Sequence, residues 1–196
     1  MSSRRTLDPM NTTAVPSRHI AELAATIGRR LTDDPERSVA AAVEALTRSA
    51  VSADSLVEVG LAGDEGLRRV VLHAEPTFSV QAVVWAPGHS TAVHDHRSWC
   101  AFRVLAGSVE EARYRRDRDG IGLVARTVLP VGETTGFAPP DDIHSVGNVG
   151  SIVAVTLHVY GVDLGDGGSA VSRWYRDPAR PVGPASGTDS SPTSAR

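Results

Sequence analysis

The most informative segment of the chain runs from Gly88 to Gly107 and reads GHSTAVHDHRSWCAFRVLAG. It places His94 and His96 two residues apart, with Cys100 four residues further on. In an extended strand, alternate residues point to the same face, so the two imidazoles and the thiol would share one wall. The imidazoles could then reach one metal ion. A bare pair of this kind also occurs in polar loops and on solvated strands, so its meaning depends on the residues around it.

Composition indicates a single folded domain with extensions at both ends. The chain has 196 residues, of which 41% are hydrophobic, enough to bury the core of one domain. We expect this domain to span 16–176, with a helical lead-in over 16–60 and a β-barrel over 68–176. Residues 1–15 mix Ser, Thr, Pro and Arg, and residues 177–196 are rich in Pro, Ser, Gly and Asp. Neither segment has apolar periodicity, and we expect both to be disordered.

Charge and hydropathy exclude several classes of partner. The formal net charge of −3 provides no basic face for nucleic acid or an anionic membrane. We find no apolar run near the ~18 residues of a membrane span, and Arg4 and Arg5 are not followed by a signal-peptide core. The single cysteine rules out an intrachain disulfide. We therefore expect a cytoplasmic protein, a monomer or small homo-oligomer, that acts on a small molecule.

Apolar spacing predicts helices near the N-terminus. Ile20, Leu23 and Ile27 recur at helical intervals, which predicts a helix from Ser17 to about Arg30. Asp34 followed by Pro35 is a typical helix start and predicts a second helix to about Ser49, while Asp54 could cap a short third one.

From about Arg68 the pattern changes to the alternation of β-strands. We expect strands at 68–73, 78–86, 99–106, 108–116, 121–129, 133–138, 143–147 and 151–160. Many short strands separated by turn residues indicate a closed or sandwiched antiparallel structure. The sequence therefore predicts an all-β barrel preceded by two or three α-helices.

The opening segment resembles the first cupin motif. In that motif Gly, His-x-His, Glu and Gly recur at the intervals that separate Gly88, His94, His96, Cys100 and Gly107. Cys100 stands where the motif has a glutamate ligand. The resemblance implies a cupin double-stranded β-helix barrel, with His94 and His96 as metal ligands.

A third ligand candidate comes from a second resemblance further along the chain. His144 and Asn148 match the end of the second cupin motif, whereas Pro140-Asp141-Asp142 lacks its usual Pro-x-Gly opening. Three neutral imidazoles would leave a bound Fe²⁺ its full charge and favour an anionic ligand. Imidazole itself suits Fe, Zn, Cu and Ni about equally, so the ligand set leaves the metal open.

The last long strand predicted, 151–160, carries a second polar group. Its odd positions, such as Leu157 and Val159, are apolar and must face a packed core. Thr156, His158 and Tyr160 then lie together on the opposite face. That face is either an ordinary solvated strand surface or the lumen of the barrel, and the neighbouring metal motif favours the lumen.

These motifs occur together in one known family. The chain carries His94-Asp-His96, Cys100, His144-x-x-x-Asn148 and Thr156-Leu-His158-Val-Tyr160. From about Arg68 to Gly161 this set resembles the cysteine dioxygenase family of thiol dioxygenases. The resemblance implies a non-haem Fe²⁺ site and the oxidation of a thiol by O₂ to a sulfinic acid.

The resemblance also implies roles for individual residues. His94, His96 and His144 would bind iron, Tyr160 would be the active-site tyrosine, and His158 would orient its hydroxyl group. Thr156 replaces the serine usual in that relay but keeps a hydroxyl. In the family, residues at the places of Cys100 and Tyr160 can be joined by a thioether, and the segment before Cys100 is one residue shorter here than in mammalian-type enzymes.

The substrate class rests on two weaker matches. Arg68 lies 17 residues before Trp85. In the family the same interval separates the carboxylate-binding arginine from a tryptophan, so the resemblance implies this role for Arg68, with Arg69 as the alternative. Trp99 in the short run after His96, and Gly161 directly after Tyr160, resemble the branch that oxidises 3-mercaptopropionate. Arg68 and Cys100 resemble the cysteine branch instead. We therefore expect a small thiol carboxylate, with cysteine slightly ahead of 3-mercaptopropionate. The competing interpretation is a metal-binding cupin of non-oxygenase type, a sensor or isomerase-like protein holding Zn or Ni.

Overall fold

The structure, a computed structural model, describes residues 18–57, 66–118, 120–165 and 168–176. The segments 1–15 and 177–196, for which disorder was expected, lie outside the described residues. The helices are α1 (Arg18–Gly28), α2 (Pro35–Arg48) and α3 (Asp54–Val57). The strands are β1 (Leu67–Glu75), β2 (Phe78–Trp85), β3 (Val93–His96), β4 (Cys100–Ala106), β5 (Ser108–Asp117), β6 (Gly120–Pro130), β7 (Thr134–Phe137), β8 (His144–Gly147), β9 (Ala154–Tyr160) and β10 (Val171–Tyr175).

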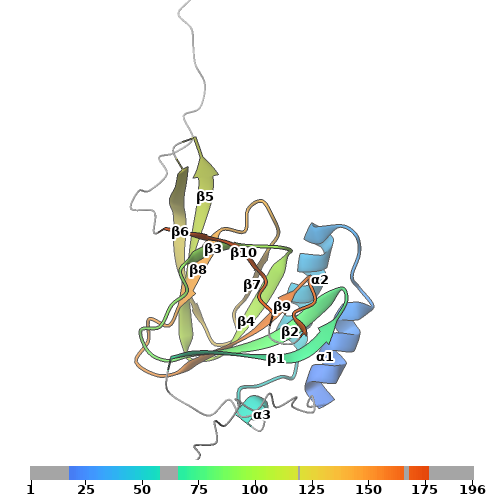
Figure 1. The fold of residues 1–196 in the computed structure, drawn as a ribbon. Coiled ribbons are helices and arrows are strands. Elements are labelled where there is room, and N and C mark those ends of the chain that lie inside the picture. Colours follow the sequence, from blue (N-terminus) through green and yellow to red (C-terminus); the bar gives the residue numbers. More distant parts are fainter. Residues whose placement is uncertain (1–17, 58–65, 119, 166–167, 177–196) are drawn as a thin grey trace, which may run out of the picture.

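The strands form two five-stranded antiparallel sheets. The first sheet has the order β1-β2-β9-β4-β7 and the second has the order β10-β3-β8-β5-β6. β9 lies between β2 and β4 although four strands separate it from β4 in the chain, so consecutive strands are not simply neighbours. Two facing sheets with this crossover confirm the all-β cupin barrel predicted from the sequence (Figure 1).

The helices cover the outer face of the first sheet. α1 buries Ile20, Leu23 and Ile27, the residues whose spacing predicted it. α2 begins as expected, because the Asp34 carboxylate accepts hydrogen bonds from the backbone N–H groups of Glu36 and Arg37 at 3.0 and 3.3 Å. Figure 1 shows both helices on one side of the barrel. No helix in the described part of the chain is long and apolar enough to span a bilayer.

Strand alternation divides the apolar residues between two cores. Ala82 and Val84 of β2 and Leu157 of β9 pack with the helices, whereas Val83 and Trp85 pack between the two sheets. All eight residues of β2 are buried, because one face of this strand meets the helices and the other faces the barrel interior. The first sheet therefore presents a defined inner face to the second.

The eight predicted strands are all present, with ends shifted by no more than three residues. Within the described residues the structure adds two strands to them, β3 and β10. Each has at most five residues. β3 pairs with β8 and β10, and β10 pairs with β3, so all of these partners are distant in sequence. Neither has the apolar alternation that identifies a strand locally.

Gly107, the last glycine of the opening segment, makes the tight connection between β4 and β5. Its φ is +65°, and a Cβ atom there would lie 2.9 Å from both the Ala154 Cα and the Val153 carbonyl oxygen. Gly88, the first glycine of that segment, has a similar φ of +76° but nothing within 4 Å of a Cβ position. Conformation alone favours glycine at Gly88, whereas Gly107 also lacks the space for a side chain.

We expect Gly88→Ala to lower the free energy of unfolding by about 1–2 kcal/mol, the cost of a non-glycine residue in the left-handed region. Gly107→Ala should cost about 1–3 kcal/mol more, because its methyl group must also displace the β9 backbone. Urea unfolding of both variants measures the difference. Equal losses would show that the close approach of β9 to Gly107 is not a constraint.

Candidate metal centre

Three buried histidines meet on the inner side of the second sheet. His94 and His96 lie two apart on β3, and His144 is the first residue of β8. The two strands pair so that His94 lies directly opposite His144. One ring nitrogen from each histidine lies within 4.8 Å of the others. The structure thus brings together the three residues that the two motifs singled out.

Hydrogen bonds fix which nitrogen each ring can offer to a metal. His94 Nδ1 lies 2.9 Å from the Ala92 carbonyl oxygen, and His144 Nδ1 lies 2.9 Å from Glu111 Oε1. Both partners only accept, so each Nδ1 carries the proton and donates it. The Nε2 lone pairs of His94 and His144 are therefore left for the centre of the cluster.

His96 is held mainly through its backbone. Its N–H donates to Asp142 Oδ2 at 2.7 Å, and its ring Nδ1 lies 3.5 Å from the same oxygen, too far for a good hydrogen bond. Burial acts to raise the pKa of Asp142, but the hydrogen bonds from His96 outweigh it and the pKa lies below its ordinary value. Asp142, which belongs to the altered opening of the second motif, is thus a charged support for a ligand.

His94 and His144 are in the protonation state that metal binding requires. Burial, helped by His144 and His96, lowers the pKa of His94 to about 3. Burial also lowers the pKa of His144 to well below its ordinary value. Both rings are neutral at neutral pH, and a neutral imidazole is the form that coordinates a metal ion.

The donor set fits a first-row transition metal. Three imidazole nitrogens converge, and two carboxylates, Glu111 and Asp142, stand behind them. Such outer carboxylates orient histidine ligands and raise their basicity. We therefore describe the cluster as a three-histidine metal site.

Glu111 is a functional residue that the sequence analysis missed. It lies buried on β5, where it accepts from His144 and, at 3.0 Å, from Arg113 Nε. Burial raises the pKa of Glu111, and the charge of Arg113 opposes that rise. Arg113 in turn donates to Thr135 Oγ1 at 2.6 Å. An acidic residue on the same face of the strand as Val109 is the signal that could have identified it.

A hydrogen-bonded relay faces the metal site from β9. Thr156 Oγ1 lies 2.8 Å from His158 Nε2, and His158 Nδ1 lies 3.2 Å from the Tyr160 hydroxyl. The rings of Tyr160 and His96 are 6.0 Å apart and stacked, which places the end of the relay beside the metal cluster. These three side chains line the barrel interior, as expected, and not a solvated surface.

Cys100 lies at the same end of the relay. On β4 it is directly opposite Tyr160 of β9, and its Sγ is 4.0 Å from His158 Nδ1. The thiol is fully buried. Burial raises the pKa of both Cys100 and Tyr160 well above their ordinary values, so each group keeps its proton at neutral pH.

The β1 register separates the two arginines considered for substrate binding. Arg68 lies opposite Val84, a residue of the helix-facing core, whereas Arg69 lies opposite Val83, which faces the barrel interior. The interval to Trp85 had pointed to Arg68, but β1 has a bulge between Val71 and His73 that the interval does not reveal. Arg69 shares the inner face, and its charge is felt at His94, His158 and Tyr160.

Trp99, also considered for substrate binding, lies in the helix-facing core. Its indole occupies the place where residue 161 would carry a side chain: a Cβ atom on Gly161 would lie 2.1 Å from Trp99 Nε1. The Gly161 N–H also donates to the Trp99 carbonyl at 3.0 Å. Trp99 and Gly161 thus form one packing contact behind the first sheet and do not face the metal cluster.

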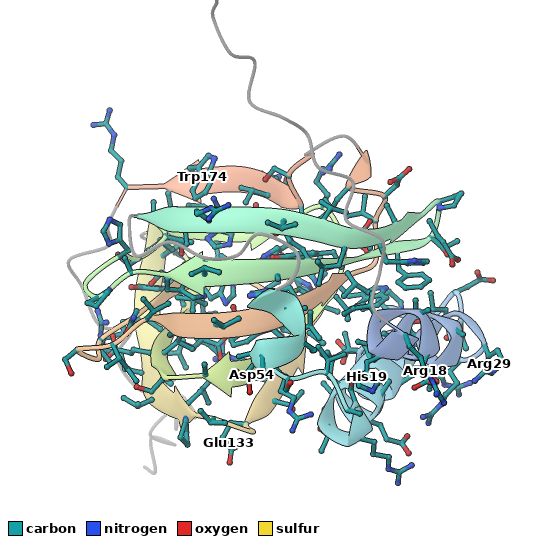
Figure 2. The ribbon with its side chains drawn as sticks, turned by 90° about the horizontal axis from the view of Figure 1, so that it is seen from below. Arg18, His19, Arg29, Asp54, Glu133 and Trp174 are labelled. Carbon is teal, nitrogen blue, oxygen red and sulfur yellow. The ribbon has the colours of Figure 1, made fainter. Side chains whose placement is uncertain are left out.

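Two residues near the site had no signal in the sequence. Trp174 on β10 lies opposite His94, with ring centroids 5.2 Å apart, and is 57% exposed (Figure 2). Gln81 on β2 lies opposite His158 and is buried. Both become neighbours of the site only through strand pairing.

The fold and site define a cupin barrel with a three-histidine metal centre. A family model described as cysteine dioxygenase type I matches residues 43–165. Because this match covers more than half of the sequence, the chain belongs to the cysteine dioxygenase type I family.

Solved structures match a smaller part of the chain. An oxalate oxidase in complex with glycolate is 21% identical over 52% of this chain and 53% of its own, with a TM-score of 0.43. A cupin superfamily protein from Desulfitobacterium hafniense is 17% identical over 52% of this chain and 83% of its own, with a TM-score of 0.40. A cupin domain from Schizosaccharomyces pombe is 16% identical over 53% and 66%, with a TM-score of 0.43. This chain spans about half the length of the oxalate oxidase.

We expect Glu111→Gln to weaken metal binding about 10- to 100-fold, because the neutral amide no longer raises the basicity of His144. The matched control is Glu110→Gln, which removes the neighbouring carboxylate from a partly exposed pair with Arg126. Titration of the metal-free proteins with Co²⁺, followed by its absorption, measures both affinities. The same Co²⁺ affinity in both variants would show that Glu111 does not contribute to metal binding.

Proposed function

We propose that this protein is a non-haem Fe(II) thiol dioxygenase that oxidises a small thiol carboxylate to its sulfinic acid. In this reaction both atoms of one O₂ molecule are transferred to the sulfur. The observation that carries the proposal is the arrangement of three buried imidazoles beside Tyr160, which a buried relay holds in place. Membership of the cysteine dioxygenase type I family supports it.

His94, His96 and His144 would hold the iron. Bound there, Fe²⁺ would deprotonate the thiol, provide one centre at which sulfur and O₂ meet, and exchange electrons with them. The chain contributes ligands without negative charge, so an anionic thiolate is favoured beside them. Glu111 keeps the ring of His144 in position, and Asp142 holds the backbone of His96.

Tyr160 would supply a hydrogen bond inside the barrel. Because burial raises its pKa, the phenol remains protonated at neutral pH and can donate. His158, stacked between Phe102 and Tyr160 at centroid distances of 4.9 and 5.6 Å, restrains the hydroxyl group. A metal-binding cupin of non-oxygenase type would have no evident use for this relay beside its ligands.

Arg69 would bind the carboxylate of the substrate. A guanidinium group can form two parallel hydrogen bonds with a carboxylate, which fixes orientation as well as charge. Arg69 lies on the inner face of β1, and among the described residues no ion-pair partner is found for it. Cys100 and an arginine near the start of β1 are features of the cysteine branch, so we propose that cysteine is preferred over 3-mercaptopropionate.

The test compares thiols with and without a carboxylate. Iron-loaded protein should consume O₂ with cysteine and 3-mercaptopropionate, and mass spectrometry should identify the sulfinates. Arg69→Gln should raise KM for these substrates about tenfold or more, because a charge-assisted pair of about 1.5–3 kcal/mol is lost. KM for cysteamine, which has no carboxylate, should change little.

Arg68→Gln is the matched control and should leave both KM values within about twofold, because Arg68 lies on the helix-facing side. The assignment of Arg69 is wrong if the two variants behave alike. An iron-loaded protein that consumes no O₂ with any thiol in the panel would contradict the proposed function itself.

We further propose that Cys100 and Tyr160 become joined by a thioether during aerobic turnover, as their opposed positions on β4 and β9 allow. The bond replaces one S–H and one ring C–H, with O₂ as the oxidant, so the intact mass should fall by about 2 Da. Tyr160→Phe serves as the control that keeps a free thiol. Complete labelling of Cys100 in denatured wild-type protein after turnover would exclude the crosslink.

A further inference from the structure

The relay on β9 continues to a tryptophan on the neighbouring strand. Trp85 Nε1 lies 2.9 Å from Thr156 Oγ1, which in turn lies 2.8 Å from His158 Nε2. His158 Nδ1 lies 3.2 Å from the Tyr160 hydroxyl. All four side chains lie on the inner face of the first sheet, and Trp85 is 2% exposed. Three hydrogen bonds thus connect an indole to the tyrosine beside the metal cluster.

The first member of this chain of bonds sets the direction of the others. An indole N–H can donate but cannot accept, so Trp85 must donate to the Thr156 oxygen. The Thr156 hydroxyl is fully buried, and among the described residues His158 Nε2 is the one acceptor within reach of its hydrogen. If His158 Nε2 carried a proton instead, the Thr156 hydrogen would be buried without a partner, which is unfavourable.

The remaining steps follow from the ring chemistry of His158. Burial lowers the pKa of His158 well below its ordinary value, so the ring is neutral and carries one N–H. With Nε2 accepting from Thr156, that N–H is at Nδ1 and donates to the Tyr160 oxygen. The hydrogen of Tyr160 is then left for an acceptor in the barrel interior, either the Cys100 sulfur opposite it or a group at the adjacent metal cluster.

We propose that Trp85 is a positioning residue: its indole N–H orients the Thr156 hydroxyl, holds His158 as the Nδ1–H tautomer and leaves Tyr160 as a donor toward the metal cluster. The use of that donor in catalysis rests on the proposed function. The tautomer itself is a property of the metal-free chain.

Local packing supports this role for Trp85. Trp85 lies opposite Ala154 of β9. The small side chain of Ala154 leaves room for the indole to reach Thr156, the next inward-facing residue of β9. Its carbonyl oxygen accepts a hydrogen bond from Asn148 Nδ2 at 2.9 Å, so the end of the second motif anchors the strand at Trp85. Thr156, being β-branched, has few rotamers, and its hydroxyl is held between its two partners.

The tautomer can be measured directly in metal-free protein labelled with ¹⁵N-histidine. We expect a single Nδ1–H pattern for His158 at pH 7, assigned by its loss in His158→Gln. Trp85→Phe keeps an aromatic ring but removes the donor and should give a mixture of both tautomers. Thr156→Val removes the hydroxyl at nearly constant volume and should do the same, whereas Thr156→Ser should retain the single tautomer.

Kinetics provide a second readout in iron-loaded protein. Trp85→Phe should lower kcat about tenfold and change KM less than twofold, because a misoriented proton donor affects the reaction and not binding. An Nε2–H tautomer in the wild type, or an unchanged single tautomer in a folded Trp85→Phe protein, would overturn the proposal. A single Nδ1–H tautomer in a protein that oxidises no thiol would support the role of Trp85 and overturn only the proposed function.

Discussion

The pairing of β9 with both β2 and β4 is the constraint on which the rest of the structure depends. It places Thr156, His158 and Tyr160 beside Trp85 on one side and beside Cys100 and Phe102 on the other. The apolar residues of the same strand, Leu157 and Val159, bind the first sheet to the helices. A slip of one residue would exchange the two faces, so core packing and the relay specify the same register.

The metal centre depends on a balance between burial and charge. Burial removes the imidazoles of His94 and His144 from water and lowers their pKa values, which keeps them in the neutral state that coordinates a metal. Two buried carboxylates would be unfavourable in such a place without partners. Glu111 is paired with His144 and Arg113, and Asp142 accepts a hydrogen bond from the His96 N–H. Both buried carboxylates therefore have partners, and these partners include two of the metal-site histidines.

The two sides of the first sheet illustrate how closely a site residue and a packing residue can resemble each other in a sequence. Arg68 and Arg69 are adjacent, yet only Arg69 shares a face with Val83 and the barrel interior. Trp99 and Gly161 look like substrate-site features when each is taken alone. In the fold they are two halves of one contact, since the indole takes the space of a side chain at residue 161.

The sequence by itself determined the fold class, eight of the strands, the N-cap of α2 and the three clustered histidines, because each leaves a local pattern of periodicity or spacing. Tertiary structure alone decided that β10 pairs with β3, that Glu111 accepts a hydrogen bond from His144 and that Trp85 donates one to Thr156. It also decided that Arg69, and not Arg68, faces the barrel interior, through a bulge in β1. These contacts join residues on different strands, and strand pairing with its irregularities is set by packing across the whole barrel, which no local spacing records.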